Sequence, residues 1–198
     1  GANLLAEERG RIMRDMHDGV GGVLVSTLAM VEMGQTTREG IQEAIRDAIH
    51  DLRLMIDSLD PTEGDLLAVL GMFRGRLEPR LASAGLRFEW RVQDVPALPG
   101  LGPRQVLQIL RILQEAVQNV LKHAGARTVF VSTGTATYQT IGNGLYIEIR
   151  DDGQGFSHAK NGGRGLANMR DRARAIGGEC EVRSNSAGTS VRLHIPLG

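Results

Sequence analysis

A histidine followed directly by an aspartate, His17-Asp18, lies within residues 7–31, whose pattern predicts an amphipathic helix. Because the unperturbed pKa of histidine is near neutrality, a ring nitrogen is available to attack an electrophile. The neighbouring carboxylate can orient the ring and act as its base. The pair therefore predicts a nucleophile with its own base, and the alternative is an ordinary pair of surface side chains.

A polar line on the helix predicted over residues 103–123 is a second candidate for chemistry. Glu115, Asn119 and Lys122 are spaced four and three residues apart, so they lie on one helix face. Mg²⁺ prefers oxygen ligands and keeps several waters, so a carboxylate, an amide and an ammonium group could hold it together with phosphates. The alternative is solvated helix surface. The apolar residues form a separate stripe of Val106, Leu110, Leu113, Val117 and Val120.

Two glycine-rich segments follow this helix. Residues 151–156, Asp-Asp-Gly-Gln-Gly-Phe, come directly after a predicted strand, where Asp151 could meet a ligand while the glycines let the backbone turn. Asp-Gly pairs also form plain turns, so both interpretations stay open. Residues 161–166, which include Gly163 and Gly165, open a predicted helix, and helix N-termini favour phosphate. The polar segment 157–161 between them is either a lid or a connecting loop.

These glycines do not form a dinucleotide-binding fingerprint. The third glycine of that motif would fall at Asn168, and no predicted strand immediately precedes the run. The glycine-lysine phosphate loop is also missing from the sequence.

The first sixty residues are helical in pattern. Apolar residues of the second helix recur at steps of four and three from Ile41 to Leu59, the spacing of helices packed side by side. A turn over residues 33–37, with an N-cap at Thr36 or Thr37, separates two helices. We expect a second copy to cover the hairpin and form a four-helix bundle; the alternative is docking on the rest of the chain. The stripe of the first helix is Met13, Met16, Val20, Leu24, Thr27 and Val31.

The pattern changes after Pro61, a residue type that disfavours helix in the residue before it. Helices are predicted over residues 65–84, 103–123 and 166–176, and strands over 86–92, 127–133, 145–150, 179–184 and 190–195. We therefore expect an α+β chain, with a helical hairpin in residues 1–60 and an α/β sandwich in residues 61–198.

The composition excludes several classes of protein. Lys plus Arg and Asp plus Glu number 23 each, so no net basic field attracts nucleic acid. Cys180 is the only cysteine, which excludes an intramolecular disulfide framework, and five histidines show no metal-ligand spacing. The sequence shows neither a membrane span nor a signal peptide, and we expect the cytoplasmic part of a longer receptor.

The order of these segments resembles sensor histidine kinases of the NarX/DesK type. Residues 115–123 resemble the N box of their ATP-binding domain, the Bergerat fold, and residues 151–156 and 163–170 resemble its two glycine boxes. Residues 188–190 resemble the final glycine-threonine element, and residues 8–18 the phosphoacceptor box. The resemblance covers nearly the whole chain.

The resemblance implies a role for each candidate residue. His17 is the expected phosphoacceptor, Asp18 its base, and Asn119 the Mg²⁺ ligand, with Glu115 supporting the metal or its water. Asp151 is expected to bond the adenine amino group. The other nucleotide contacts implied are Gly153, Gly155, Gly163 and Gly165 along the nucleotide, Lys122 near phosphate, and Thr189 closing the adenine pocket.

The implied reaction is attack by His17 on the γ-phosphoryl group of ATP, followed by transfer to an aspartate on the receiver domain of a response regulator. The cofactors are ATP and Mg²⁺, the assembly is a homodimer, and the chain itself touches no nucleic acid. Residues 60–64 are expected to be the hinge between the two domains.

One position departs from the resemblance. A glutamine that positions water for dephosphorylation of the partner often lies four residues after the acidic residue, and here that position is Gly22. We therefore expect weak phosphatase activity. Gly19, Gly21 and Gly22 also cost a helix about 1 kcal/mol each relative to alanine, so we expect either close packing or a soft spot there.

Two other functions share part of this pattern. An ATP-hydrolysing enzyme of the same fold shares Glu115, Asn119 and the glycines, but it needs neither His17-Asp18 nor a dimerising hairpin. A non-catalytic ATP-sensing module needs no intact His17.

Overall fold

The computed structural model describes residues 1–59, 65–93, 95–123, 125–155 and 164–197. The chain divides into two compact units, Gly1–Pro61 with Gly102–Leu107, and Thr62–Leu101 with Gln108–Gly198. The predicted hinge, residues 60–64, and the predicted lid or loop, residues 157–161, lie outside the described residues.

The first unit is built on a helical hairpin of α1 (Ala2–Glu32) and α2 (Arg38–Ser58). Thr37 caps α2, since its Oγ1 accepts a hydrogen bond from the backbone N–H of Gly40 at 3.1 Å. The predicted hairpin and one of the two predicted N-caps are therefore confirmed.

Helix α1 is continuous through its three central glycines. A Cβ atom added to Gly19, Gly21 or Gly22 would meet nothing within 4 Å. Within this chain, close helix packing therefore does not compensate for their helix-weakening effect, and the predicted soft spot stays a prediction.

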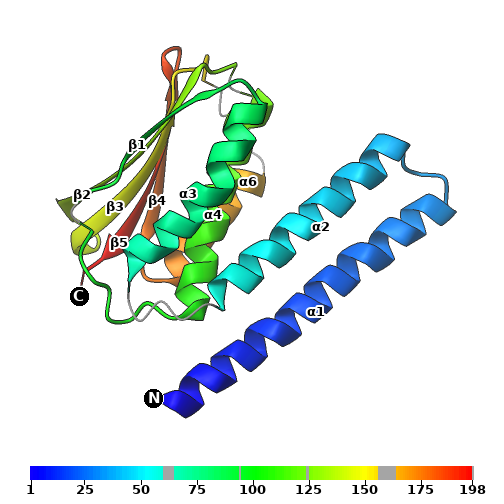
Figure 1. Cartoon of the computed structure of the whole chain (residues 1–198), viewed down its shortest axis with the longest axis horizontal. Helices are drawn as coiled ribbons and strands as arrows, with labels where there is room; N and C mark the ends of the chain where they lie inside the picture. Colours follow the sequence, from blue (N-terminus) through cyan, green and yellow to red (C-terminus); the bar gives the residue numbers. More distant parts are fainter. Residues whose placement is uncertain (60–64, 94, 124, 156–163, 198) are drawn as a thin grey trace. The chain divides into compact units, whose positions relative to one another are not determined.

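The second unit is an α/β sandwich (Figure 1). Its strands are β1 (Arg87–Arg91), β2 (Thr128–Tyr138), β3 (Gly142–Asp151), β4 (Glu179–Asn185) and β5 (Gly188–Pro196), and their order is β1-β2-β3-β5-β4. β1 pairs with β2 in parallel, and the other pairs are antiparallel. The helices α3 (Leu66–Ser83), α4 (Pro103–His123) and α6 (Arg164–Ala175) cover one face of the sheet, which confirms the predicted sandwich.

The core lies between the helices and this face of the sheet. Strand β3 alternates as predicted, because Leu145, Ile147 and Ile149 are buried while Glu148 and Arg150 point to the open face. The predicted apolar stripe of α4 is likewise buried throughout. The last residue of β3 is Asp151.

Four strands are longer than predicted, β2 and β3 by the most. Strand β2 runs to Tyr138 instead of residue 133, and β3 begins at Gly142 instead of residue 145. Gly134 interrupts the sequence pattern of β2, but its cross-strand neighbour Tyr146 lies so close that a Cβ on Gly134 would be 2.4 Å from the phenol oxygen. The ring of Tyr146 covers the glycine, and the strand therefore continues.

Candidate active site

Asp151, the last residue of β3, is buried, with 3% of its surface exposed. Its Oδ1 accepts a hydrogen bond from the backbone N–H of Gly153 at 2.8 Å. Burial raises the pKa of Asp151, while the backbone N–H groups of Gly153 and Thr189 act in the opposite direction. A carboxylate kept from water in this way can be matched to one specific donor.

The segment 151–155, here called the glycine loop, contacts the β4–β5 turn backbone to backbone. Gly155 has φ +72°, and a Cβ there would lie 2.1 Å from the carbonyl oxygen of Asn185. Gly188 has φ +135°, and a Cβ there would lie 2.0 Å from the carbonyl oxygen of Asp151. Only glycine fits these two positions without moving the backbone.

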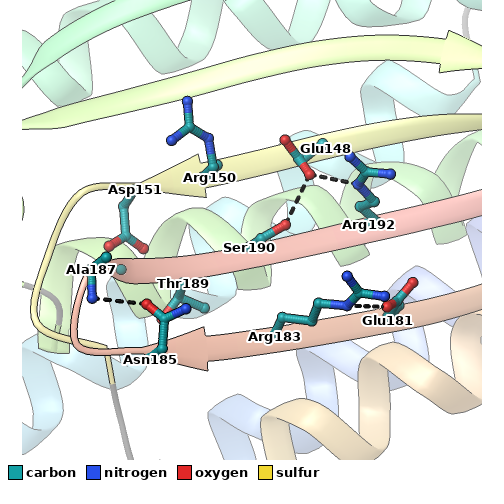
Figure 2. A pocket seen from close by; sticks show the side chains of 11 residues that line it. Glu148, Arg150, Asp151, Glu181, Arg183, Asn185, Ala187, Thr189, Ser190 and Arg192 are labelled. Atoms are coloured by element: carbon teal, nitrogen blue, oxygen red, sulfur yellow. Dashed lines mark hydrogen bonds and ion pairs between the residues drawn. The ribbon is translucent and has the colours of Figure 1, made fainter.

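This contact places Asp151 beside Thr189, as Figure 2 shows. Thr189 is buried, and its Oγ1 lies 2.9 Å from Oγ of Ser184 on β4. Two predicted site residues that are far apart in sequence therefore meet at one end of the sheet.

The polar line of α4 approaches the beginning of α6. Glu115 and Asn119 are half-buried and Lys122 is exposed. A Cβ on Gly165 would lie 2.6 Å from Oε1 of Glu115, so the second glycine segment passes directly against this carboxylate. Gly163 lies outside the described residues.

The segment that follows α4 is also connected to the glycine loop. The Oδ1 atom of Asp152 accepts hydrogen bonds from the backbone N–H groups of Arg127 and Thr128 at 2.8 and 2.9 Å. Gln154 lies next to Gly125, because a Cβ atom added to this glycine would be 3.7 Å from Nε2 of Gln154. Sequence reasoning did not identify Asp152, because a second aspartate before glycine has the pattern of a plain turn.

In the hairpin, His17 and Asp18 lie at the surface of α1. Nδ1 of His17 is 3.6 Å from Oδ1 of Asp18, and the two side chains are 91% and 84% exposed. The predicted nucleophile is therefore accessible, with its carboxylate just beyond hydrogen-bonding distance. A second His-Asp pair, His50-Asp51, occurs in α2, but there the histidine is half-buried.

A pocket of about 490 Å³ opens on the face of the sheet that the helices do not cover. Glu148 Oε2 accepts hydrogen bonds from Ser190 Oγ at 2.9 Å and from Arg192 Nε at 2.5 Å. Figure 2 shows both bonds as dashed lines. Asp151 and Thr189 line one end of this pocket, and none of the described residues of α4 does. The pocket is therefore separate from the line of Glu115 and Asn119.

The described residues contain no group of three or more His, Cys, Asp or Glu side chains placed to hold a metal ion. Glu115 and Asn119 nevertheless place two half-buried side chains with oxygen atoms on one helix face. Such a pair suits Mg²⁺, which takes its remaining ligands from waters and phosphates.

Comparison with known families finds two matches along the chain. Residues 8–64 match the family model of histidine kinases, and residues 105–198 match that of the histidine kinase-, DNA gyrase B- and HSP90-like ATPases. The chain belongs to the sensor histidine kinases. The resemblance to the NarX type is confirmed, and the second match indicates an ATP-binding domain in this kinase family.

The relatives of this histidine kinase chain are longer than the chain itself. It is 28% identical over 212 residues to sensor histidine kinase LiaS of Bacillus subtilis (strain 168), which covers 98% of the chain and 56% of LiaS. It is 29% identical over 198 residues to the nitrate/nitrite sensor protein NarX of Escherichia coli (strain K12), covering 93% of the chain and 32% of NarX. The chain thus spans about half the length of these relatives, or less.

A solved structure supports the same fold. The histidine kinase domain of the blue-light activated histidine kinase EL346 from Erythrobacter litoralis superposes with a TM-score of 0.60 at 17% identity, covering 98% of this chain and 94% of that domain. Among the described residues, no helix is long and apolar enough to span a membrane.

Proposed function

We propose that this chain is the kinase core of a sensor histidine kinase, which phosphorylates His17 from ATP and passes the phosphoryl group to an aspartate of a response regulator. The observation that supports this most strongly is the almost fully exposed His17 in a chain that also holds an ATPase-family nucleotide fold. An enzyme that only hydrolyses ATP has no use for such a histidine.

In this proposal the adenine end of ATP lies at the contact between the glycine loop and the β4–β5 turn. Asp151 accepts a hydrogen bond from the adenine amino group, and Thr189 closes the pocket beside it. Because Asp151 is buried, this hydrogen bond forms away from competing water and discriminates against bases without a donor.

The phosphates lie toward α4 and α6. Gly153, Gly155 and Gly165, with Gly163 outside the described residues, let the backbone approach the nucleotide, and Lys122 reaches phosphate. Asn119 and Glu115 would hold Mg²⁺, which neutralises charge on the phosphate oxygens when it is bound.

Phosphoryl transfer begins with His17. Nε2 forms the N–P bond to the γ-phosphorus while the bond from phosphorus to the β–γ bridging oxygen breaks, and ADP leaves with that electron pair. Asp18 faces Nδ1, so it orients the ring and stabilises the proton held there. An aspartate of the receiver domain then attacks the phosphohistidine and restores the neutral ring.

The proposal assigns residues 1–60 to a dimerisation and phosphoacceptor domain and residues 61–198 to the catalytic domain. The hinge at residues 60–64 lets the nucleotide reach His17. Two hairpins pair into a four-helix bundle, which is supported by the apolar side chains exposed on α1 and α2.

The test is incubation with γ-labelled ATP and Mg²⁺. We expect a label on the protein that is lost in acid and survives base, as a phosphoramidate does, and that is absent from His17→Ala. His50→Ala is the matched control, because it removes the histidine of the other His-Asp pair on the same hairpin.

Other outcomes identify the rival functions. Free phosphate without labelled protein would indicate an ATPase, and ATP binding without either product would indicate a non-catalytic sensing module. Equal loss of the label in both histidine variants would contradict the assignment of His17.

A further inference from the structure

We infer that Asp152 is a positioning residue. Its carboxylate accepts two hydrogen bonds, here called the tie, which connect the glycine loop to the segment following α4 and thereby hold Asp151 in place for adenine. Its consequence for nucleotide binding rests on the proposed function. The tie itself does not, since it is a feature of the nucleotide-free chain.

The inference starts from the end of the β2–β3 ladder. The last pair in that ladder is Val129 with Asp151, and the next residue on β2 is Thr128. The chain turns away after Asp151, so the backbone of Asp152 does not continue the ladder. Instead, the carboxylate of Asp152 accepts the N–H groups of Thr128 and Arg127 at 2.9 and 2.8 Å. A side chain therefore replaces the backbone acceptor that the strand no longer provides.

These two bonds are charge-assisted. The backbone N–H of Thr128 is the main cause that lowers the pKa of Asp152, so the side chain stays ionised at neutral pH. Hydrogen bonds to an ionised acceptor are stronger than neutral ones, which suits a side chain that is otherwise exposed to water.

The tie joins two parts of the candidate active site. Arg127 and Thr128 follow the C-terminal end of α4, the helix of Asn119 and Lys122, after a short connection. Asp152 directly follows Asp151 and precedes Gly153, whose N–H bonds Asp151. Loss of the tie therefore frees the backbone directly after the carboxylate that is proposed to bind adenine.

The decisive variant is Asp152→Ala, with Asp65→Ala as its matched control. Asp65 is also an aspartate that accepts a backbone N–H, since its Oδ1 caps α3 by bonding Ala68 N at 3.1 Å. Asp152→Ala loses two hydrogen bonds from backbone N–H groups and Asp65→Ala loses one, but only Asp152 adjoins Asp151. Asp152→Asn keeps an oxygen acceptor at the same position and serves as the rescue variant.

Without nucleotide, we expect Asp152→Ala to speed amide hydrogen exchange at Arg127, Thr128 and Gly153 by about tenfold, the effect of losing a hydrogen bond to a charged group. Asp65→Ala should leave these three amides unchanged. Unchanged exchange in Asp152→Ala, or equal acceleration in both variants, would overturn the tie.

With nucleotide, the readout is the ratio of the affinities for ATP and for ITP, which lacks the amino group on its base. Asp152→Ala should weaken ATP binding about tenfold and reduce this ratio, whereas Asp65→Ala should leave the ratio unchanged and Asp152→Asn should stay within about threefold of the wild type. An unchanged ratio in Asp152→Ala overturns the positioning of Asp151. Failure of the wild-type chain to bind ATP refutes the proposed function instead, and the exchange experiment still decides whether the tie exists.

Discussion

At the scale of single residues, the burial of Asp151 has opposite consequences for stability and for the proposed recognition of adenine. Asp151 is buried, and its raised pKa means that the folded chain disfavours the charged carboxylate. The same low exposure makes a hydrogen bond to a ligand selective. His17 shows the opposite arrangement, because its exposed ring is accessible to a phosphoryl donor.

Asp151→Asn is expected to separate these two effects. At pH 7 the buried carboxylate is charged, and its burial lowers the stability of the folded chain. A neutral amide of the same shape should therefore raise the free energy of unfolding, measured in urea titrations, by on the order of 1 kcal/mol. ATP binding should fall at least tenfold, because the amide at best pairs weakly with the adenine amino group.

The pH dependence checks the same assignment. A raised pKa means that ATP affinity should fall with decreasing pH sooner than it would for an ordinary aspartate, and Asp151→Asn should remove this decline. Asp171→Asn on α6, which removes an exposed carboxylate paired with Arg174, is the control that should change neither property. An unchanged affinity for ATP in Asp151→Asn would contradict the role of Asp151.

Gly22→Gln tests the predicted link between this position and phosphatase activity. The position is exposed and a Cβ there meets nothing within 4 Å, so the longer side chain fits. We expect dephosphorylation of the cognate response regulator to increase severalfold, measured as loss of aspartyl phosphate over time. Gly19→Gln is the control, since it gives α1 the same gain of about 0.5–1 kcal/mol in helix propensity one turn earlier. Equal rates in both variants would refute the link.

At the scale of elements, glycines decide which segments can approach each other. The glycine loop meets the β4–β5 turn at Gly155 and Gly188, and α6 meets α4 at Gly165. These contacts join elements that are distant in sequence, and each brings a backbone against a residue of the candidate site. The close approaches therefore define the shape of the proposed nucleotide site.

Gly165→Ala should reduce activity with little loss of stability. The added Cβ would lie 2.6 Å from Oε1 of Glu115, and a flexible side chain can move away, so the fold survives while Glu115 is displaced. We expect autophosphorylation to slow about tenfold, because small displacements of positioned groups are costly.

Gly75→Ala is the matched control for Gly165→Ala, because its Cβ meets nothing within 4 Å on α3. It should stabilise the chain by about 1 kcal/mol without changing activity. Thermal unfolding and the labelling assay distinguish the two variants, and equal activity in both would show that the approach of Gly165 to Glu115 is unimportant.

At the scale of the whole molecule, exposed apolar side chains concentrate on the hairpin. Among the described residues, every large hydrophobic side chain that is exposed lies on the hairpin, except Leu67 on α3. They include Met13, Leu24, Val31 and Ile45 from the predicted stripes. A surface of this kind marks an interaction site, and a second copy of the hairpin has the matching helix spacing.

Leu24→Glu should therefore weaken the proposed dimer. Burial of a leucine contributes about 1.5–3 kcal/mol, and each dimer loses two, so its dissociation constant should rise at least a hundredfold in sedimentation experiments. Leu67→Glu changes the exposed leucine outside the hairpin and should leave the dimer intact. ATP binding should persist in both variants, and a wild-type chain that is monomeric at high concentration would refute the dimer.

Local patterns in the sequence predicted most of the elements. The 3.6-residue and two-residue periods report which side chains are buried, which explains the success for α4 and β3. Among the strands that were predicted too short, β2 contains Gly134, and only the neighbour of this glycine across the sheet explains why the strand continues. The types of the site residues were also visible, although their roles stay predictions.

The sequence by itself determined the two kinds of architecture, the resemblance to histidine kinases and the pairing of His17 with a nucleotide domain, because these depend on residue type and short-range spacing. Only the tertiary structure decided which distant residues meet. The insertion of β5 between β3 and β4 brings Gly188 and Thr189 against Asp151. The turn after β3 brings Asp152 to the N–H groups of Arg127 and Thr128, at the beginning of β2. The order of the strands and the close contacts between distant backbone segments depend on packing across the sheet, and a local sequence pattern does not predict them.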